Sequence, residues 1–448
     1  MVGMVFSAVG FHKGEPHMLK KPISLMVSAL LLIMAFTGCS GSQADTDGKT
    51  VLTLWTFVGQ HADFYKEMAK EWNQLHPDQQ IHLEVETYPV GHMHNKLLMS
   101  LYAKVGAPDI ADVEVNWFPN FLKGEPQLVP LNDIVDPVRD RLVQSRVDIY
   151  SKDDTVYGVG FHVGAAVIYY NKEILDDAGV DPDQIKTWDD FVAAGKIVKE
   201  KTGKPMLTIE TNDQYGFWPL LIQQGSDYFD ENGNVILDNE TNIKTLTFLH
   251  DLVYKHEIAI LAPGGFHHAE EYYGFMNKGG AASLVMPLWY MSRFTDFMPD
   301  LKGKIIVRPL PVWEEGGLRS AGMGGTGTVV TNQTEHPELA KKFIQFAKLS
   351  KRGNIKIWQL LSFDPIRWDV WDEPELRESN KFTDYFGDGI FDMMLEIKDE
   401  IHSPNIGEKT TIMNDHVTSN VLYHALRTRN KSPAEALRDA AQEVRRER

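Results

Sequence analysis

Aromatic, amide and acidic side chains follow four of the strands that the sequence predicts. They stand in the stretches 57–61 (FVGQH), 114–117 (EVNW), 210–212 (ETN) and 287–290 (PLWY). Aromatic rings can cover the C–H faces of a sugar, while carboxylate, amide and imidazole groups can bind its hydroxyls. Ligands of open α/β sheets bind at the carboxyl ends of the strands. Together the four stretches predict a carbohydrate site, although each one alone is also compatible with core packing.

The motifs that would indicate other chemistry are missing or stand in the wrong context. The sequence has no G-x-S-x-G, no H-E-x-x-H and no Walker loop. Residues 322–327 (GMGGTG) match G-x-G-x-x-G, but a dinucleotide fingerprint lies between a strand and a helix, whereas here a loop precedes and a strand follows. We interpret this loop as bare backbone that a ligand can approach closely.

Histidines and carboxylates are the side chains that could support metal binding or hydrolysis. His92 and His94, and the pair His267 and His268, lack further ligands at metal spacing, which favours surface or capping histidines and predicts no metal and no cofactor. A glycosidase needs two carboxyl groups a fixed distance apart. Such a pair can be drawn from the 62 Asp and Glu residues, so a secreted glycoside hydrolase stays as the enzymatic alternative.

The single cysteine, Cys39, follows a short apolar run. The run spans 23–36, fewer than the ~20 residues that a membrane crossing needs, and two lysines precede it, as in a secretory signal. The pair before the cysteine, Thr-Gly, resembles the lipobox of bacterial lipoproteins. We therefore predict a leader and signal peptide over 1–38, a lipid anchor at Cys39 and a flexible tether over 39–50. A buried structural cysteine is the alternative, and Met18 is the predicted true start.

Composition limits the partners and sets the size of the fold. The formal net charge is −17, which argues against nucleic acid and anionic sugars as ligands and leaves a neutral ligand possible. The remaining chain is long enough for two lobes, each with a core. Strands and helices alternate from 51 to 115 and again from 163 to 286, which predicts an α/β fold with mostly parallel sheets. A helix predicted over 335–353 begins with Pro337 and ends at Gly353.

The order of several short motifs resembles a known family. LWTF (54–57), APDI (107–110), IYYN (168–171), TWDD (187–190) and GGAA (279–282) followed by Trp289 are similar to the family 1 extracellular solute-binding proteins of sugar ABC importers, the relatives of maltose-binding protein. Three longer stretches also resemble the arabino-oligosaccharide-binding lipoproteins of Gram-positive bacteria: ETND (210–213), PGGFHHAEEYYGFMN (263–277) and FDPIRWDVW (363–371).

This resemblance implies a two-lobed periplasmic-binding-protein-like fold of the maltose-binding type that closes on its ligand by a hinge motion. The N-lobe would comprise 51–160 and 311–352, and the C-lobe 161–306 and 355–448. The chain would cross between them at 160–167, 306–311 and 352–355. The protein would be a monomer without catalytic activity. It would be held by its lipid anchor at the extracellular face of the cytoplasmic membrane and would hand neutral oligosaccharides to ABC permease subunits.

The resemblance also implies a set of ligand-binding residues. Carried over position by position, the set is Phe57, His61, Glu114, Trp117, His162, Gly164, Glu210, Asn212, Trp218, Trp289, Tyr290, Gly324, Gly325, Arg367, Trp368 and Tyr423. Gly164 departs from the acidic residue of the maltose-binding branch. His268 is added from its place before the predicted helix that leads to the strand at 280, with a helix N-cap as the alternative. The predicted ligand is an arabino-oligosaccharide; a xylo- or malto-oligosaccharide, a hydrolase and a surface adhesion or scaffold protein are the alternatives.

Overall fold

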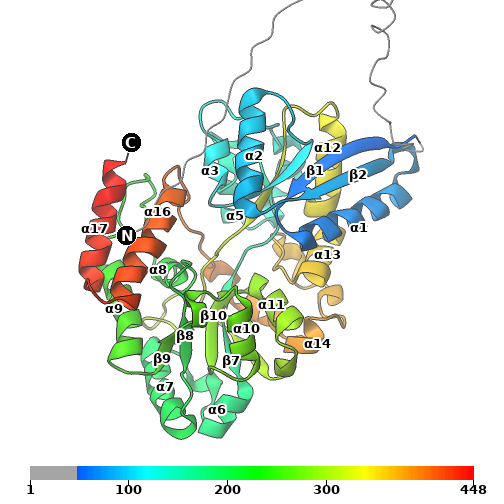
Figure 1. Ribbon diagram of the computed structural model, residues 1–448. Helices are drawn as coiled ribbons and strands as arrows, with labels where there is room; N and C mark the ends of the chain where they lie inside the picture. Colours follow the sequence, from blue (N-terminus) through cyan, green and yellow to red (C-terminus); the bar gives the residue numbers. More distant parts are fainter. Residues whose placement is uncertain (1–47, 448) are drawn as a thin grey trace, which may run out of the picture. The chain divides into compact units, whose positions relative to one another are not determined.

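The computed structural model describes residues 48–447 and contains two five-stranded sheets. The leader, Cys39 and most of the predicted tether lie outside the described residues. Among residues 48–447, no helix combines the length and the apolar character that crossing a membrane requires. Figure 1 shows the first sheet with the helices labelled α1, α2 and α12 around it, and the second sheet with α6, α7 and α10 around it.

The first sheet has the strand order β2-β1-β3-β12-β6. Its strands are β1 (Thr50–Thr56), β2 (Ile81–Thr87), β3 (Ile110–Glu114), β6 (Val159–Gly160) and β12 (Thr326–Val330). Strands β1, β2 and β3 are parallel, which confirms the prediction for this part of the chain. Strand β12 is antiparallel to β3 and β6, because it enters the sheet on its return from the second lobe.

The second sheet has the order β11-β7-β10-β8-β9. Its strands are β7 (Ala166–Asn171), β8 (Leu207–Ile209), β9 (Ala259–Leu261), β10 (Ser283–Pro287) and β11 (Ile305–Arg308). Strands β8, β9 and β10 are parallel, whereas β7 runs antiparallel to both of its neighbours, β10 and β11. A two-residue pair, β4 (Ser151–Lys152) and β5 (Thr155–Val156), forms a separate hairpin.

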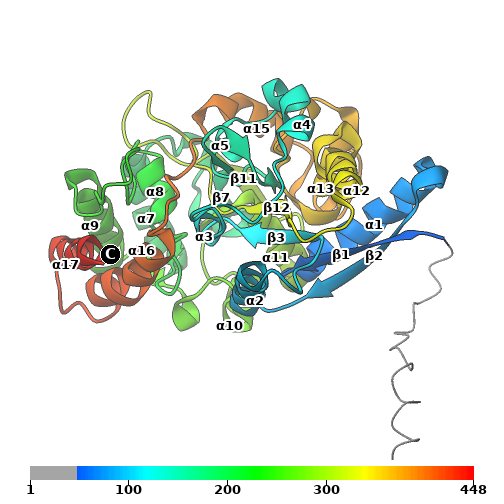
Figure 2. The same ribbon diagram turned by 90° about the horizontal axis from the view of Figure 1, so that it is seen from above.

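Helices cover both faces of the first sheet. They are α1 (Gly59–Leu75), α2 (Val90–Ala103), α3 (Phe118–Phe121), α4 (Asn132–Val135), α5 (Ser145–Asp148), α12 (Pro337–Ile344) and α13 (Lys351–Leu361). Apolar residues of α1 and α12 pack on one face of the sheet, and those of α2 and α3 on the other. Figure 2 shows α12 and α13 beside α1.

Helices also cover both faces of the second sheet. They are α6 (Lys172–Ala178), α7 (Trp188–Thr202), α8 (Trp218–Ile222), α9 (Glu240–Tyr254), α10 (Glu270–Asn277), α11 (Met291–Phe297), α14 (Thr383–Phe386), α15 (Ile390–Ile397), α16 (Thr410–His416) and α17 (Pro433–Arg446). One apolar cluster contains α6 to α9, α16, α17 and the π-helical segment Val417–Arg427. Another contains α10, α11, α14 and α15.

The predicted helix end at Gly353 is wrong. A π-helical segment, Gln345–Leu349, continues from α12, and Ser350 then caps the new helix α13 by accepting a hydrogen bond from the Gly353 N–H. Glycine is needed there because a Cβ would lie 2.1 Å from the carbonyl oxygen of Ala347. Gly353 therefore stands in the first turn of α13, where its backbone lies close to that of Ala347.

The segments between the two sheets run beside one another. The chain leaves β6 and enters β7, and the Met323 N–H donates to the Gly164 carbonyl 2.7 Å away. Ala321 and Met323, in a segment that the sequence assigns to the first lobe, pack in an apolar cluster of the second sheet. The third expected crossing, 352–355, lies inside α13. Trp358 of that helix packs with the second lobe, and Leu361 packs with the first.

Candidate functional site

A cavity of about 180 Å³ lies where the two lobes and their crossing segments meet. Its lining is aromatic and apolar, with a few polar and charged groups. The residues are Phe57, Val58, Gln60, His61, Glu114, His162, Tyr215, Trp289, Ser292, Arg293, Gly324, Gly325, Thr326, Leu360, Leu361, Phe363 and Lys381. Seven of the predicted site residues are among them: Phe57, His61, Glu114, His162, Trp289, Gly324 and Gly325.

The turn between β1 and α1 brings Phe57 and His61 to the cavity. Strand β1 ends at Thr56, and α1 begins three residues later at Gly59, so His61 stands in the first turn of the helix. The imidazole stacks on Phe161 at a ring-centroid distance of 4.3 Å. Its Nδ1 lies 3.1 Å from Oδ2 of the fully buried Asp112. This side of the cavity therefore offers an aromatic ring and an imidazole of fixed orientation.

Glu114 ends β3 and turns its carboxyl group toward the cavity. Its two oxygens accept hydrogen bonds from the backbone N–H and the side-chain amide of Asn116, each at 2.8 Å. Burial raises the pKa of Glu114 to about 8, the negative charge of Asp213 adds to the shift, and the bonds from Asn116 oppose it. Trp117, three residues on, stacks instead on His94 at 5.1 Å and does not line the cavity.

The crossing segments contribute a second wall. His162 lines the cavity, and neither of its buried ring nitrogens has a hydrogen-bond partner among the described residues. Gly324 and Gly325 have φ values of +71° and +143°, a region that favours glycine. A Cβ on Gly325 would lie 2.6 Å from the Tyr150 hydroxyl. Gly164 does not line the cavity; a Cβ there would lie 2.1 Å from the Met323 carbonyl oxygen, so its small size lets two crossing strands touch.

The second lobe presents Trp289 and Tyr215, whose rings meet edge to face at 5.1 Å. Trp289 donates its indole N–H to the Met323 carbonyl at 3.2 Å. His268 stacks behind Trp289 at 5.5 Å, and burial lowers its pKa to about 3. It is not the helix N-cap, since Ala269 holds that position of α10. Tyr290 is buried below and donates to the His267 carbonyl at 2.6 Å.

A buried polar cluster lies in the same lobe without lining the cavity. Glu210 is fully buried and accepts a hydrogen bond from the His267 N–H at 3.2 Å, while its Oε1 has no partner among the described residues. Burial and the charge of Asp213 raise the pKa of Glu210 well above its usual value. Asn212 is exposed and bonds to the Gly264 carbonyl and the Arg427 guanidinium. The structure thus places Glu210 and Asn212 in bonds within their own lobe.

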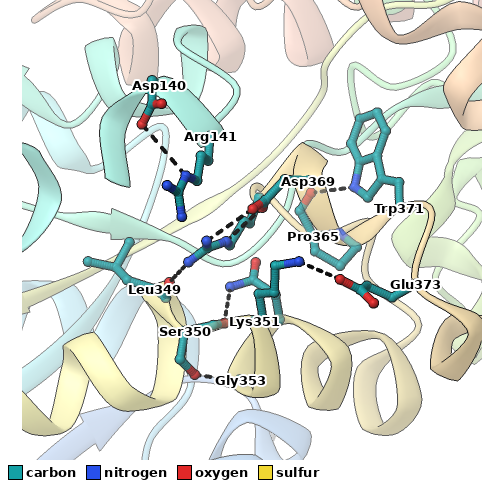
Figure 3. Close-up of polar contacts among 12 residues, drawn as sticks. Asp140, Arg141, Leu349, Ser350, Lys351, Gly353, Pro365, Asp369, Trp371 and Glu373 are labelled. Atoms are coloured by element: carbon teal, nitrogen blue, oxygen red, sulfur yellow. Dashed lines mark hydrogen bonds and ion pairs between the residues drawn. The ribbon is translucent and has the colours of Figure 1, made fainter. Parts of the chain in front are cut away.

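Trp218, Arg367, Trp368 and Tyr423 lie away from the cavity. Trp218 is buried at the start of α8 and stacks on Tyr228 at 4.5 Å. The Arg367 guanidinium binds the Asp369 carboxylate, with Nε 2.7 Å from Oδ1, and donates to the Leu349 carbonyl. Figure 3 shows this turn, with Asp369, Leu349 and Trp371 labelled. Trp368 and Tyr423 are 40% and 42% exposed on the surface.

Several lining residues were not identified from the sequence. They are Val58, Gln60, Tyr215, Ser292, Arg293, Thr326, Leu360, Leu361, Phe363 and Lys381. Val58 and Gln60 lie within the stretch 57–61 that predicted the carbohydrate site. Phe363 begins one of the stretches that carried the family resemblance, and Tyr215 stands two residues after another, so that signal was available. Leu360 and Leu361 belong to the last turn of α13, past the predicted helix end at Gly353, and Lys381 lies in a later segment.

The lining suits a ligand with apolar faces and a polar rim. Aromatic rings stand on both lobes, and His162, Ser292, Arg293 and Glu114 offer hydrogen-bonding groups around them. Glu114 carries the one carboxyl group among the described residues that line this cavity, whereas glycoside hydrolysis uses a pair. Residues 48–447 contain no cluster of three or more His, Cys, Asp or Glu placed to hold a metal ion.

Comparisons with known proteins agree with this architecture. The family model of the bacterial extracellular solute-binding proteins matches residues 59–351. The chain is 54% identical over 400 residues to an arabinooligosaccharide-binding protein of Halalkalibacterium halodurans, covering 89% of this chain and 90% of that one. It is 52% identical over 431 residues to an arabinooligosaccharide-binding protein of Bacillus subtilis, covering 95% and 99%. The sugar-binding protein MalE of Xanthomonas citri has the same fold, with a TM-score of 0.74 at 19% identity over 88% of this chain and 96% of that one.

Proposed function

Because the chain belongs to the bacterial extracellular solute-binding protein family, we propose that it binds arabino-oligosaccharides between its two lobes and delivers them to an ABC importer. The observation that carries the proposal is a cavity at the meeting point of both lobes and the crossing segments, lined by rings and unpaired polar groups. Identity above 50% to two proteins named for this ligand class supports the choice of sugar.

The lining supports recognition of a neutral sugar rather than its cleavage. The indole of Trp289 and the ring of Phe57 provide faces for sugar C–H groups. The two ring nitrogens of His162, which have no partner within residues 48–447, leave one donor and one acceptor for hydroxyl groups, because a neutral imidazole has one of each. A buried polar group without a partner costs free energy, so a hydroxyl-bearing ligand would relieve that cost.

A hinge motion between the lobes forms part of the proposal. The cavity of about 180 Å³ is smaller than the ~300–1,000 Å³ of common ligand pockets, so a ligand of several sugar rings requires the lobes to move. Two hydrogen bonds join α16 of the second lobe to the segment after β3 of the first: Thr411 donates to the Asn116 carbonyl, and the Asn414 amide donates to the Asn116 side chain. These bonds belong to a state in which the lobes are together.

The location of the protein completes the proposal. Cys39 would carry the lipid that holds the protein at the outer face of the cytoplasmic membrane, and residues 40–49 would be the tether, one residue shorter than predicted because Thr50 begins β1. Labelling cells with a radioactive fatty acid tests the anchor, since Cys39→Ser should abolish incorporation. The protein would act as a monomer, which sedimentation of the unlipidated chain tests directly.

Calorimetric titration of residues 40–448 with arabinotriose, xylotriose and maltotriose tests the ligand assignment. We expect heat with arabinotriose alone and an intact trisaccharide when the mixture is recovered and chromatographed. Binding of xylotriose or maltotriose instead would retain the sugar-binding role and overturn the arabinose assignment. Cleavage of the trisaccharide would favour a hydrolase. Folded protein that gives no heat with any of the three would contradict the proposed ligand class.

A further inference from the structure

A buried group of polar side chains lies directly behind His61, on the side away from the cavity. Its centre is Asp112 of β3, which is fully buried. Hydroxyl groups surround the carboxylate: Thr56 donates to Oδ2 at 2.9 Å, and Tyr65 and Thr328 donate to Oδ1 at 2.8 Å. His61 Nδ1 completes the set, 3.1 Å from Oδ2.

A buried lysine lies on the far side of this group. The Lys348 ammonium donates to the Val159 carbonyl at 2.8 Å and to the Thr328 hydroxyl, and it stands 3.3 Å from the ring centroid of Phe161. Burial by itself raises the pKa of Asp112, but the hydrogen bond from His61, the charge of Lys348 and the hydrogen bond from Tyr65 hold that pKa below its usual value. The carboxylate is therefore the anionic centre of the group.

This arrangement determines which nitrogen of His61 carries a proton. A carboxylate surrounded by donors can only accept at Nδ1, so Nδ1 must carry its hydrogen. The ring stacks on Phe161, and Phe363 meets it edge-on at 5.6 Å, which fixes its plane. No hydrogen bond to Nε2 occurs within the described part of the chain.

We propose that Asp112 is a positioning residue, which holds His61 in the Nδ1–H tautomer so that Nε2 accepts a hydrogen bond from a ligand hydroxyl. The identity of the ligand in this inference rests on the proposed function, whereas the tautomer of His61 does not depend on it. It explains why a carboxylate that never reaches the cavity is kept fully buried behind one of the cavity residues. The cost of burying it is offset by four donors and a nearby ammonium.

Nuclear magnetic resonance of protein labelled in its histidine rings tests the tautomer without any ligand. The signals of His61 are assigned by their loss in His61→Phe, and their nitrogen shifts should show Nδ1–H and an unprotonated Nε2 near neutral pH. In Asp112→Asn the amide can donate to Nδ1, so the Nε2–H tautomer should appear. Tyr65→Phe removes a different donor from the same carboxylate and should leave the tautomer unchanged.

Titration with arabinotriose then tests the role in binding. Asp112→Asn should weaken binding about tenfold, as should His61→Phe, and the double variant should be no weaker than His61→Phe alone, because Asp112 acts through His61. If Asp112→Asn does not fold, the double variant Asp112→Asn with Lys348→Met, which removes both buried charges together, is measured in its place. Additive losses, an Nε2–H or doubly protonated ring in the wild type, or an unchanged tautomer in Asp112→Asn would overturn the inference. Wild-type protein that shows the Nδ1–H tautomer but binds no arabinotriose would contradict the proposed ligand alone.

Discussion

Ligand binding should take up a proton at Glu114, and affinity should therefore fall as the pH rises. In the structure the pKa of Glu114 is about 8, raised from 4.5 by burial and then by the charge of Asp213. Asp213 belongs to the other lobe and follows β8. Separation of the lobes would hydrate Glu114 and remove this charge from its surroundings, so its pKa would return toward 4.5. Closing the lobes on a ligand reverses both changes.

The magnitude follows from the two pKa values. A rise from 4.5 to about 8 favours the protonated form by ~5 kcal/mol at most, at about 1.4 kcal/mol for each unit. At pH 7 a carboxyl group with a pKa of about 8 is roughly nine-tenths protonated, whereas one at 4.5 is almost fully ionised. Binding should thus take up as much as ~0.9 proton near pH 7. The association constant should fall up to about tenfold for each pH unit and level off above pH ~8.

Calorimetry in two buffers that differ in ionisation enthalpy measures the proton uptake directly. The observed binding enthalpy should depend on the buffer, with a slope equal to the number of protons taken up. Glu114→Gln is the matched control, because an amide keeps the size of the side chain but does not titrate. It should give a slope near zero and an affinity that is flat above pH ~7. Wild-type enthalpies that do not depend on the buffer would refute the reasoning. A slope that persists in Glu114→Gln would show that a group other than Glu114 takes up the proton.

Three further substitutions test the assignment of residues to cavity, core and lobe contact. Trp289→Ala should weaken arabinotriose binding by ~1–3 kcal/mol in calorimetry, while Trp368→Ala, which removes the same side chain outside the cavity, should leave the dissociation constant unchanged. Trp218→Ala should lower the free energy of unfolding in urea by ~3–5 kcal/mol because it empties a buried, stacked position. Asn116→Ala removes the side-chain hydrogen bond from Asn414 of α16, while the bond from Thr411 to the backbone carbonyl remains, and it should weaken binding by ~1 kcal/mol, with a larger radius of gyration in solution scattering of the ligand-free protein.

Local patterns were sufficient to predict the strands and the residues that follow them. Alternating strands and helices over 51–115 identified β1, β2 and β3, and their parallel order follows from the short connections between them. Since parallel strands end at one edge, the residues after β1 and β3 meet there, and Phe57, His61 and Glu114 line one cavity. Trp289 follows β10 in the same way.

Residues whose surroundings depend on distant segments could not be placed from the sequence. Trp218 looked like a binding tryptophan, but its indole N–H donates to Asp227 at 2.6 Å inside the second lobe. Arg367 was expected to meet a ligand, but its guanidinium donates to the Leu349 carbonyl in the preceding π-helical segment as well as to Asp369. Leu361 was overlooked because the π-helical segment before α13 shifts where that helix begins and ends. In each case a contact formed by the fold decides whether an aromatic, cationic or apolar side chain faces the cavity.

The cavity residues of the two lobes are held in place by different kinds of contact. On the first lobe, His61 and Thr328 bond to the same Asp112, and Thr328 lies on β12 four residues after Gly324. The imidazole and the glycine backbone are therefore fixed to one rigid group of strands. On the second lobe, Trp289 is held by Tyr215 and His268. In the proposed hinge motion this aromatic platform would move toward His61, so a ligand would have to contact both at once, and a sugar could do so because its C–H face and its hydroxyl rim belong to one ring.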